Sequence, residues 1–254
     1  MTSEFQLVQL SDPHIGASWA DRDPAATLAA SVDAVLRLHD RVDAVLVSGD
    51  LTEDGAPADY RTLARELARL PAPVHVIAGN HDDRDALRDQ FGLAGAPGDP
   101  VQYAAELGPL RLVALDSTRA GSAAGELDGE RLAWLDAELA RAAAVPTIVA
   151  VHHPPLATGS EAWDAIGLPA RDRRALAAVL ARHPQVARVV SGHIHMTIVS
   201  SLAGRPVLAA PSTYVQAELD LGAPRIAFGD EPPAFAVHAL AGGELASYVR
   251  SVPW

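Results

Sequence analysis

The sequence contains no cysteine in its 254 residues, and this absence removes several kinds of chemistry at once. A disulfide framework, a zinc-thiolate site and a thiol nucleophile are all excluded. Any bound metal must therefore be held by imidazole, carboxylate or amide oxygen. The redox compartment stays open, because a cysteine-free chain suits a reducing cytosol without requiring one.

Lysine and long hydrophobic runs are missing as well. All 20 basic residues are arginines, set against 32 acidic residues and a formal net charge of −12. Such an acidic chain repels a long polyanion, so we do not expect DNA or RNA as an extended partner. The longest apolar runs, such as 145–151, are strand-sized and predict no membrane insertion. Residues 1–5 lack the pattern of a signal peptide, which favours a cytoplasmic location.

Strand-like and helix-like segments alternate over most of the chain. Apolar residues such as Leu28, Val32 and Val35 recur near helical spacing, whereas short β-prone runs predict strands. The expected strands are 5–10, 43–47, 73–77, 101–107, 110–116, 146–151 and 187–190, and the expected helices are 24–39, 57–70, 82–91, 130–142 and 171–182. The pattern predicts an α/β protein (α+β by some schemes) with mixed sheets.

From about residue 196 the pattern changes, and only strands are expected, at 197–202, 205–209, 234–240 and 245–249. No linker, repeat or low-complexity block divides the sequence. We therefore predict a single domain over residues 1–254 with a β-rich C-terminal part from about 196.

Five of the predicted strands end in polar residues that can bind metal. In an open α/β sheet the carboxyl ends of the strands meet at one crevice, where ligands bind. Glycines beside several of these residues allow sharp turns and close approach of the backbone. The five segments are Asp12-Pro13-His14, Gly49-Asp50, Gly79-Asn80-His81-Asp82, His152-His153 and Gly192-His193-Ile194-His195.

The residue types in these segments suit first-row metals, because carboxylate, imidazole and amide oxygen are their common donors. A bridging carboxylate is the usual means of holding two ions about 3.5–4 Å apart. Asp50 stands alone on its strand end between the other groups, so we expect it to be the bridge.

In this order the five segments resemble those of the calcineurin-like metallophosphoesterases, over residues 7 to about 216. The motifs of residues 79–82, 152–155 and 192–195 are similar to those of the bacterial cyclic nucleotide phosphodiesterases and glycerophosphodiesterases. An isolated Asp-x-His is common by chance, whereas five segments in order are specific. The resemblance implies a four-layer αββα sandwich of two mixed β-sheets flanked by helices. By analogy with the family, a homodimer is expected.

The resemblance also implies a ligand set and a reaction. Asp12, His14 and His195 would hold one metal, Asn80, His152 and His193 the second, and Asp50 both. The metals can be Mn, Fe, Zn or Co, divalent or trivalent. A hydroxide between the ions would attack phosphorus in line with the leaving alcohol. His81 would contact the phosphate and stabilise its charge or protonate the leaving group.

Other readings stay open at several positions. His81 is also suited to hydrogen-bonding to a metal ligand or to capping a helix. His153 could hydrogen-bond to a ligand or exchange roles with His152. Asp82 is expected to cap the following helix. Asp116 is read as structural rather than as support for a ligand, and Asp164 loosely matches an acidic position of the glycerophosphodiesterases. The remaining histidines are read as surface or core residues: His39, His75, His183 and His238.

The substrate is expected to be a small phosphodiester, either a 3′,5′-cyclic nucleotide such as cAMP or a glycerophosphodiester. A broad-specificity phosphomonoesterase is the alternative, and a non-catalytic scaffold ranks last because no ligand is missing. Loops 118–129, 158–168 and 211–216 are expected to determine substrate specificity. Their candidate contacts are Arg119, Ser212, Thr213, Tyr214 and Gln216.

Overall fold

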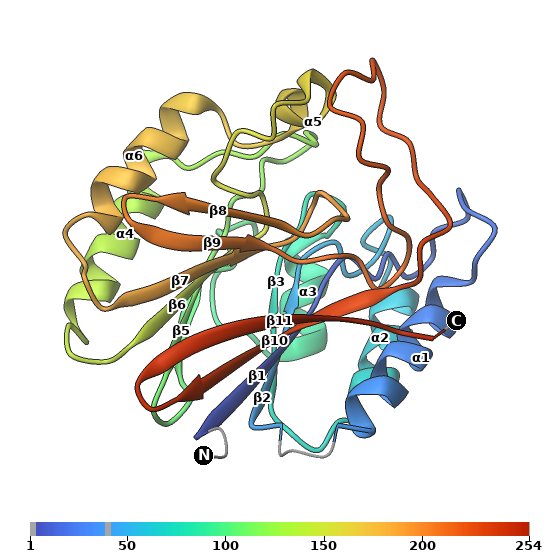
Figure 1. Ribbon diagram of the computed structural model, residues 1–254, viewed down its shortest axis with the longest axis horizontal. Helices are drawn as coiled ribbons and strands as arrows, with labels where there is room; N and C mark the ends of the chain where they lie inside the picture. The colour runs from blue at the N-terminus through green and yellow to red at the C-terminus, as the bar shows by residue number, and fades with distance from the viewer. Residues whose placement is uncertain (1–3, 39–41, 254) are drawn as a thin grey trace.

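The computed structural model describes residues 4–38 and 42–253, and within them two β-sheets pack face to face between helices. The first sheet has the strand order β11-β10-β1-β2-β3, and the second has the order β4-β5-β6-β7-β9-β8. Helices α4 and α6 lie on one side of the sheets and α1 and α2 on the other (Figure 1). Both sheets are mixed, as expected from the sequence.

The first sheet combines parallel strands from the start of the chain with a hairpin from its end. β1 pairs in parallel with β2, which pairs in parallel with β3, whereas β10 and β11 are antiparallel. The bounds are β1 Phe5–Leu10, β2 Ala44–Ser48, β3 Val74–Ile77, β10 Ala234–Ala241 and β11 Glu244–Ser251. The helices of this half are α1 Pro24–Leu36, α2 Pro57–Leu67 and α3 Arg84–Phe91.

The second sheet is parallel in its centre, where β5, β6, β7 and β9 lie side by side, and antiparallel at both edges. Its strands are β4 Tyr103–Glu106, β5 Arg111–Leu115, β6 Thr147–Val151, β7 Val186–Ser191, β8 Ile198–Leu202 and β9 Arg205–Ala209. The helices of this half are α4 Gly129–Ala140, α5 Glu161–Ile166 and α6 Ala170–Leu180.

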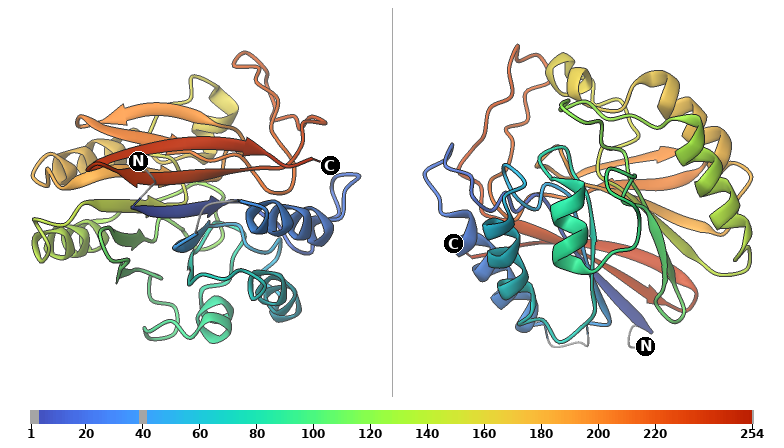
Figure 2. Two further views of the ribbon diagram at one scale, coloured as in Figure 1. Left: turned by 60° about the horizontal axis from the view of Figure 1, so that its bottom comes forward. Right: turned by 180° about the vertical axis from the view of Figure 1, so that it is seen from behind.

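Alternation along the strands builds the layers. In β1, Val8 packs among the helices of the first half, whereas its neighbour Leu7 packs between the sheets. In β5, Val113 likewise packs toward α4 and Leu112 toward the first sheet. Successive side chains of a strand point to opposite faces, so each sheet is apolar on both. The result is the predicted αββα sandwich, seen from two further sides in Figure 2.

Two parts of the sequence prediction need correction. Residues 158–168 were expected to be a loop but contain the short helix α5, whose Trp163 packs against Ile194 and Ala217. The first helix ends at Leu36, and His39 lies outside the described residues. Among the described residues, no helix combines the length and apolar character needed to cross a bilayer.

Candidate metal centre

The five polar segments meet where the strands of both sheets end. Asp12 and His14 follow β1, Asp50 follows β2, and Asn80 and His81 follow β3 of the first sheet. The second sheet contributes the histidines that follow β6 and β7, namely His152, His153, His193 and His195. A cavity of about 240 Å³ opens here, and its polar lining is His14, Asp50, Asn80, His81, His193 and His195.

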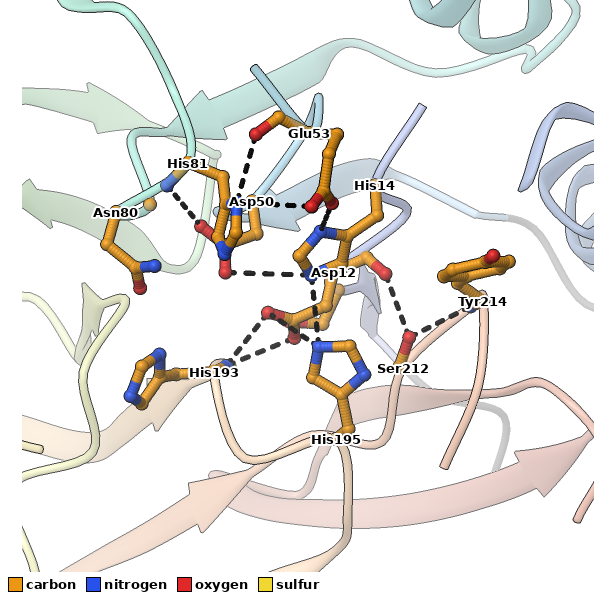
Figure 3. Close-up of polar contacts among 12 residues, drawn as sticks. Asp12, His14, Asp50, Glu53, Asn80, His81, His193, His195, Ser212 and Tyr214 are labelled. Atoms are coloured by element: carbon orange, nitrogen blue, oxygen red, sulfur yellow. Dashed lines mark hydrogen bonds and ion pairs between the residues drawn. The ribbon is translucent and has the colours of Figure 1, made fainter. Parts of the chain in front are cut away.

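Two groups of donor atoms lie near Asp50, and Figure 3 labels Asp12, His14 and His195 of the first and Asn80 and His193 of the second. In one, Nε2 of His195 lies 3.1 Å from Nε2 of His14 and 3.8 Å from Oδ1 of Asp12. In the other, Nε2 of His152 lies 3.2 Å from Oδ1 of Asn80, and the His193 ring lies beside it. Oδ2 of Asp50 lies 3.6 Å from Nε2 of His14 and 3.3 Å from that of His152, so one carboxylate oxygen faces both groups.

Four histidines of the cluster each have one ring nitrogen held by a hydrogen-bond acceptor from the surrounding chain. Nδ1 of His152 and of His195 lies 2.9 Å from the backbone carbonyls of Ser48 and Val215, and Nε2 of His193 lies 3.1 Å from that of Ile166. A carbonyl only accepts, so these nitrogens carry protons, and in the neutral ring the opposite nitrogen has the lone pair that a metal requires. Nδ1 of His14 is held in the same way by a carboxylate, that of Glu53 at 2.8 Å.

This arrangement is the one that a metal site requires. A ligating imidazole usually donates its other N–H to a carbonyl or carboxylate, which fixes the ring and its tautomer. Burial lowers the pKa of His193 and of His195 well below the usual range, which favours the neutral ring that ligates a metal. Against the effect of burial, Asp50 raises the pKa of His152 to about 9 and Glu53 raises that of His14, so a metal would have to displace a proton from these two rings. The buried residues therefore fit a pair of cations.

The two buried carboxylates differ in their surroundings. Burial raises the pKa of Asp12 to about 6, although His152 opposes the shift. Burial acts on Asp50 too, but His152 and His14 outweigh it and hold the pKa of this carboxyl well below its usual range. Asp50 is thus a fixed negative charge at the centre of the cluster.

The backbone is unusual at the same positions. Five side chains stand on residues with positive φ: Asp12 at 49°, His14 at 46°, Asp50 at 47°, His193 at 72° and His195 at 51°. Non-glycine residues rarely adopt this left-handed region, and such strain gathers at functional sites. Gly49 and Gly79 provide room, because a Cβ at either would overlap His152 or Asp50.

His81 lies beside the cluster but differs from the proposed ligands. Its backbone N–H donates to Oδ1 of Asp50 at 3.0 Å, and its Nδ1 donates to the carbonyl of Glu53 at 2.9 Å. Its side chain is 37% exposed, whereas that of His14 is 3% exposed. The ring therefore lines the open side of the cavity, where a substrate would enter.

His153 is fully buried and both its ring nitrogens have partners. Nδ1 lies 2.8 Å from Oγ of Ser117, and Nε2 donates to the carbonyl of Ala123 at 3.1 Å. Its ring packs against His152 and His193, with centroids 5.0 and 4.5 Å away. This geometry favours His152 over His153 as the ligand, with His153 packing behind it.

Asp82 does not cap the following helix, so this part of the sequence interpretation was wrong. Asp83 is the cap, and its carboxylate accepts from the backbone of Asp85 and Ala86. The Asp82 carboxylate instead accepts hydrogen bonds from the backbone N–H groups of Leu51, after β2, and Gly79, after β3. These bonds fix the loops that carry Asp50 and Asn80.

Asp116 and Asp164 lie in structural roles outside the cluster. Asp116 accepts from the backbone of Val101 and pairs with Arg84, and Asp164 accepts from Thr158. The other histidines also lie elsewhere. His75 is partly buried, His183 pairs with Asp136, and His238 is buried between the sheets.

The candidate substrate contacts of loop 211–216 mostly lie beneath the site. Ser212 and Thr213 are buried and donate to the backbone carbonyls of Asp12 and Ser11. Gln216 donates to the carbonyl of Ser212, and the ring of Tyr214 packs against those of His14 and Trp19. Arg119 lines a neighbouring cavity of about 300 Å³, which meets the first at Asn80.

Seven residues at the site were not singled out individually from the sequence, although three of them lie in loops expected to contact the substrate. Glu53 accepts from His14 and from Nε1 of Trp19, the latter at 3.1 Å. Trp19 and Phe228 lie with ring centroids 4.7 Å apart and form one wall of the cavity with Ile226. Trp163, Ile166 and Ala123 also line the cavity. Only Glu53 had a local signal, since it stands three residues after Asp50 in the same loop.

A two-sheet sandwich with clustered His and Asp residues at its strand ends indicates a metal-dependent hydrolase. The profile described as "Calcineurin-like phosphoesterase" matches residues 5–197, and the chain belongs to this family. The resemblance predicted from the five segments is thereby confirmed. The clustered Asp and His residues together with the family indicate a dinuclear metal site.

Curated relatives of this chain are named phosphodiesterases. The 3′,5′-cyclic adenosine monophosphate phosphodiesterase CpdA of Pseudomonas aeruginosa is 36% identical over 214 residues, which cover 83% of this chain and 76% of the relative. The glycerophosphodiester phosphodiesterase GpdQ of Enterobacter lignolyticus is 31% identical over 261 residues, covering 98% and 93%. A cAMP/cGMP dual specificity phosphodiesterase of Mycobacterium tuberculosis is 34% identical, covering 87% and 71%.

Solved structures share the fold at lower identity. A dimetal phosphatase from Danio rerio has a TM-score of 0.68 at 18% identity and covers 99% of this chain and 100% of its own. The purple acid phosphatase PPD1 of yellow lupin also has a TM-score of 0.68, at 15% identity, covering 98% and 51%. These similarities show the fold of the family.

Proposed function

We propose that this protein hydrolyses small phosphodiesters at a pair of metal ions. The observation that carries the proposal is the set of four buried histidines, each with one ring nitrogen held by an acceptor, of which His14 and His152 turn the other nitrogen toward Asp50. We assign Asp12, His14 and His195 to one ion, Asn80, His152 and His193 to the other, and Asp50 to both. These donors suit Mn, Fe, Zn or Co.

The chain's own residues have distinct tasks in the proposed reaction. A bound pair of ions supplies Lewis acidity and acidifies a water for attack on phosphorus. Asp50 keeps the two donor groups at a fixed separation, and its loop is held in turn by Asp82. His81 lines the open side, from which it contacts a phosphoryl oxygen and stabilises the charge that develops there.

A diester is favoured over a monoester by the charge of the cavity wall. Among the described residues that line the metal-side cavity there is no arginine, and histidines supply its cationic capacity, whereas Arg84 and Arg119 line the neighbouring cavity beyond Asn80. A terminal phosphate dianion normally gains from bidentate arginine contacts, which this wall does not offer. A diester carries a single negative charge and needs fewer arginine contacts. The phosphomonoesterase alternative is therefore ranked second.

Among diesters, the apolar lining favours a cyclic nucleotide. Trp19, Phe228 and Ile226, together with Trp163 and Ile166, line the cavity next to the metal ligands. A flat nucleobase gains from contact with aromatic rings, whereas a glycerol moiety has hydroxyl groups that such walls cannot satisfy. Relatives are named for both kinds of substrate, so the preference proposed here rests on the cavity walls and not on relatedness.

The test is hydrolysis of bis(p-nitrophenyl) phosphate by metal-stripped protein before and after addition of Mn²⁺. We expect activity to return with the metal and to be absent from Asp50→Ala, while Asp89→Ala, on the exposed face of α3, keeps it. A slower rate on p-nitrophenyl phosphate would support the diesterase, and a faster one would favour the monoesterase. A folded protein that stays inactive with every first-row metal would refute the proposal.

The remaining expectations from the sequence stay predictions. We propose that residues 1–254 act as a single domain, since both sheets contribute to the one site. A homodimer and a cytoplasmic location are expected as before, and gel filtration and cell fractionation would test them.

A further inference from the structure

A line of polar side chains runs through the apolar layer between the two sheets. Gln9 on β1, Ser48 on β2 and His238 on β10 are fully buried, at strand positions whose neighbours Leu7, Leu46 and Leu240 belong to the inter-sheet core. Buried polar groups are costly unless hydrogen-bonded, so three on one face of a core require an explanation.

These side chains form one continuous chain of hydrogen bonds that ends at a proposed metal ligand. Nε2 of His238 lies 3.0 Å from Oε1 of Gln9, and Nε2 of Gln9 donates to Oγ of Ser48 at 2.8 Å. Oγ of Ser48 donates to Oγ of Ser11 at 2.7 Å, and Ser11 donates to Oδ2 of Asp12 at 2.6 Å.

The direction of the chain is fixed at its second member. Nε2 of Gln9 also lies 2.9 Å from the backbone carbonyl of Ser191, which can only accept. The amide nitrogen of Gln9 must therefore face Ser191 and Ser48, and its oxygen must face His238. His238 then donates through Nε2, and its Nδ1 accepts from Ser247 at 2.6 Å. Burial, helped by the charge of Arg188, lowers the pKa of His238 to about 3, which keeps this ring neutral.

The Ser48 hydroxyl has a single proton and two acceptors in reach, Oγ of Ser11 at 2.7 Å and the carbonyl of Leu10 at 3.3 Å. With the proton in the shorter bond, the donors of the chain point toward Asp12. Oδ2 of Asp12 accepts from Ser11, and Oδ1 lies 3.8 Å from Nε2 of His195. The backbone N–H of His193 donates to both oxygens, at 3.0 and 3.1 Å. The backbone packs closely against this end of the chain, because a Cβ at Gly192 would overlap Oγ of Ser11. Hydrogen bonds aligned in series polarise one another inside a protein, so the last donor is stronger than an isolated hydroxyl.

We propose that Ser11, Ser48 and Gln9 are positioning residues that hold the Asp12 carboxylate, from inside the sandwich, in the orientation its metal requires. The chain orients Oδ2 inward and presents Oδ1 to the ion that His14 and His195 share. This inference rests on the metal site of the proposed function. It adds a chain of hydrogen bonds that orients the Asp12 carboxylate from the core rather than from the cavity.

The measurement is the affinity of metal-stripped protein for Mn²⁺ by calorimetric titration, which needs no substrate and no turnover. Ser11→Ala removes the last donor, and we expect it to weaken Mn²⁺ binding by about 10- to 100-fold, the usual effect of losing a hydrogen bond behind a ligand. Gln9→Met breaks the chain without touching Asp12, and we expect a smaller loss, of about 3- to 10-fold.

Matched controls separate this effect from general loss of stability. Ser31→Ala removes a buried hydroxyl that donates to a carbonyl within α1, and Gln185→Met removes an amide that donates to the carbonyl of Leu139. We expect both to lower stability and to leave Mn²⁺ affinity unchanged. Thermal unfolding of all four variants in EDTA measures how much stability each has lost.

Unchanged Mn²⁺ affinity in folded Ser11→Ala and Gln9→Met would overturn the inference and leave the proposed function intact. A wild-type protein that binds no Mn²⁺ would refute the metal site and the inference together. If Gln9→Met fails to fold, Ser11→Ala alone decides, because it removes the donor that touches Asp12.

Discussion

Glu53 and His14 share a hydrogen bond of 2.8 Å in which the carboxylate holds Nδ1 and turns Nε2 toward Asp50 and His195. Burial would raise the pKa of Glu53, but hydrogen bonds from His14 and Trp19 hold it below its usual value, so the acceptor is charged. We expect Glu53→Ala to lower Mn²⁺ affinity about 10- to 100-fold, because the ring loses its orientation. Asp54→Ala, one position along and exposed, is the control. Equal affinity in both variants would contradict the role of Glu53.

Replacing His81 should separate metal binding from catalysis. The ring lines the cavity without belonging to either proposed set of ligands, so His81→Asn should keep both ions. We expect kcat to fall by about 100-fold, within the range for loss of one group that stabilises transition-state charge. Metal analysis and steady-state kinetics on the same sample check this. Loss of metal in proportion to activity would instead make His81 a ligand.

Phe228 should influence which phosphodiester is preferred. Phe228→Ala opens the wall that this ring forms with Trp19 and removes about 0.5–1.5 kcal/mol of aromatic contact with a nucleobase. We expect kcat/KM for cAMP to fall about 3- to 10-fold while that for a glycerophosphodiester stays level. The ratio of the two values is the measurement. Equal losses on both substrates would show that the wall does not discriminate between them.

Gly49 is required by space as well as by conformation. Its φ is +94°, and an added Cβ would overlap the His152 ring. We expect Gly49→Ala to lose metal binding and activity by at least about 100-fold, since a shift of the ring misplaces a ligand. Gly204→Ala is the matched control: its φ is +75°, but its Cβ would meet open space. That variant should lose about 1 kcal/mol of stability and keep its activity.

The stability of the fold should depend on pH through His238. The folded pKa is lowered to about 3 from an ordinary 6.5, so between these values the unfolded chain binds a proton that the folded chain does not. This contribution is complete above pH 6.5 and is lost as the pH falls toward 3. From pH 7 to pH 5, wild type should lose about 2 kcal/mol more than His238→Gln, which keeps a donor but does not titrate. Urea unfolding in EDTA measures the difference, and parallel losses would contradict it.

The convergence of the site could be predicted because its residues follow strands. Asp12, Asp50 and His152 each stand at the carboxyl end of an apolar run, and parallel strands place those ends together. The alternation of Leu7 and Val8 between two cores likewise follows from strand geometry, which made the sandwich predictable.

Other features depend on contacts between distant segments, and local pattern does not encode them. Trp19 and Phe228 come from two loops that meet only after folding, with Arg22 bonded to the carbonyls of Asp230 and Glu231. Helix α5 is too short to form by its own propensity, and the packing of Trp163 stabilises it. Asp82 was misread because an acidic residue before a helix usually caps it.

Five residues of the site have a left-handed backbone: Asp12, His14, Asp50, His193 and His195. At these positions, a substitution that relieves backbone strain also removes a side chain that the proposed activity needs. Glycine at any of these positions would relax about 1 kcal/mol or more of strain and remove a donor atom in the same step. A library of variants screened only for heat resistance would therefore accumulate substitutions at the metal centre. A descendant of this protein that had stopped hydrolysing phosphodiesters would be recognisable by glycines where these five side chains now stand.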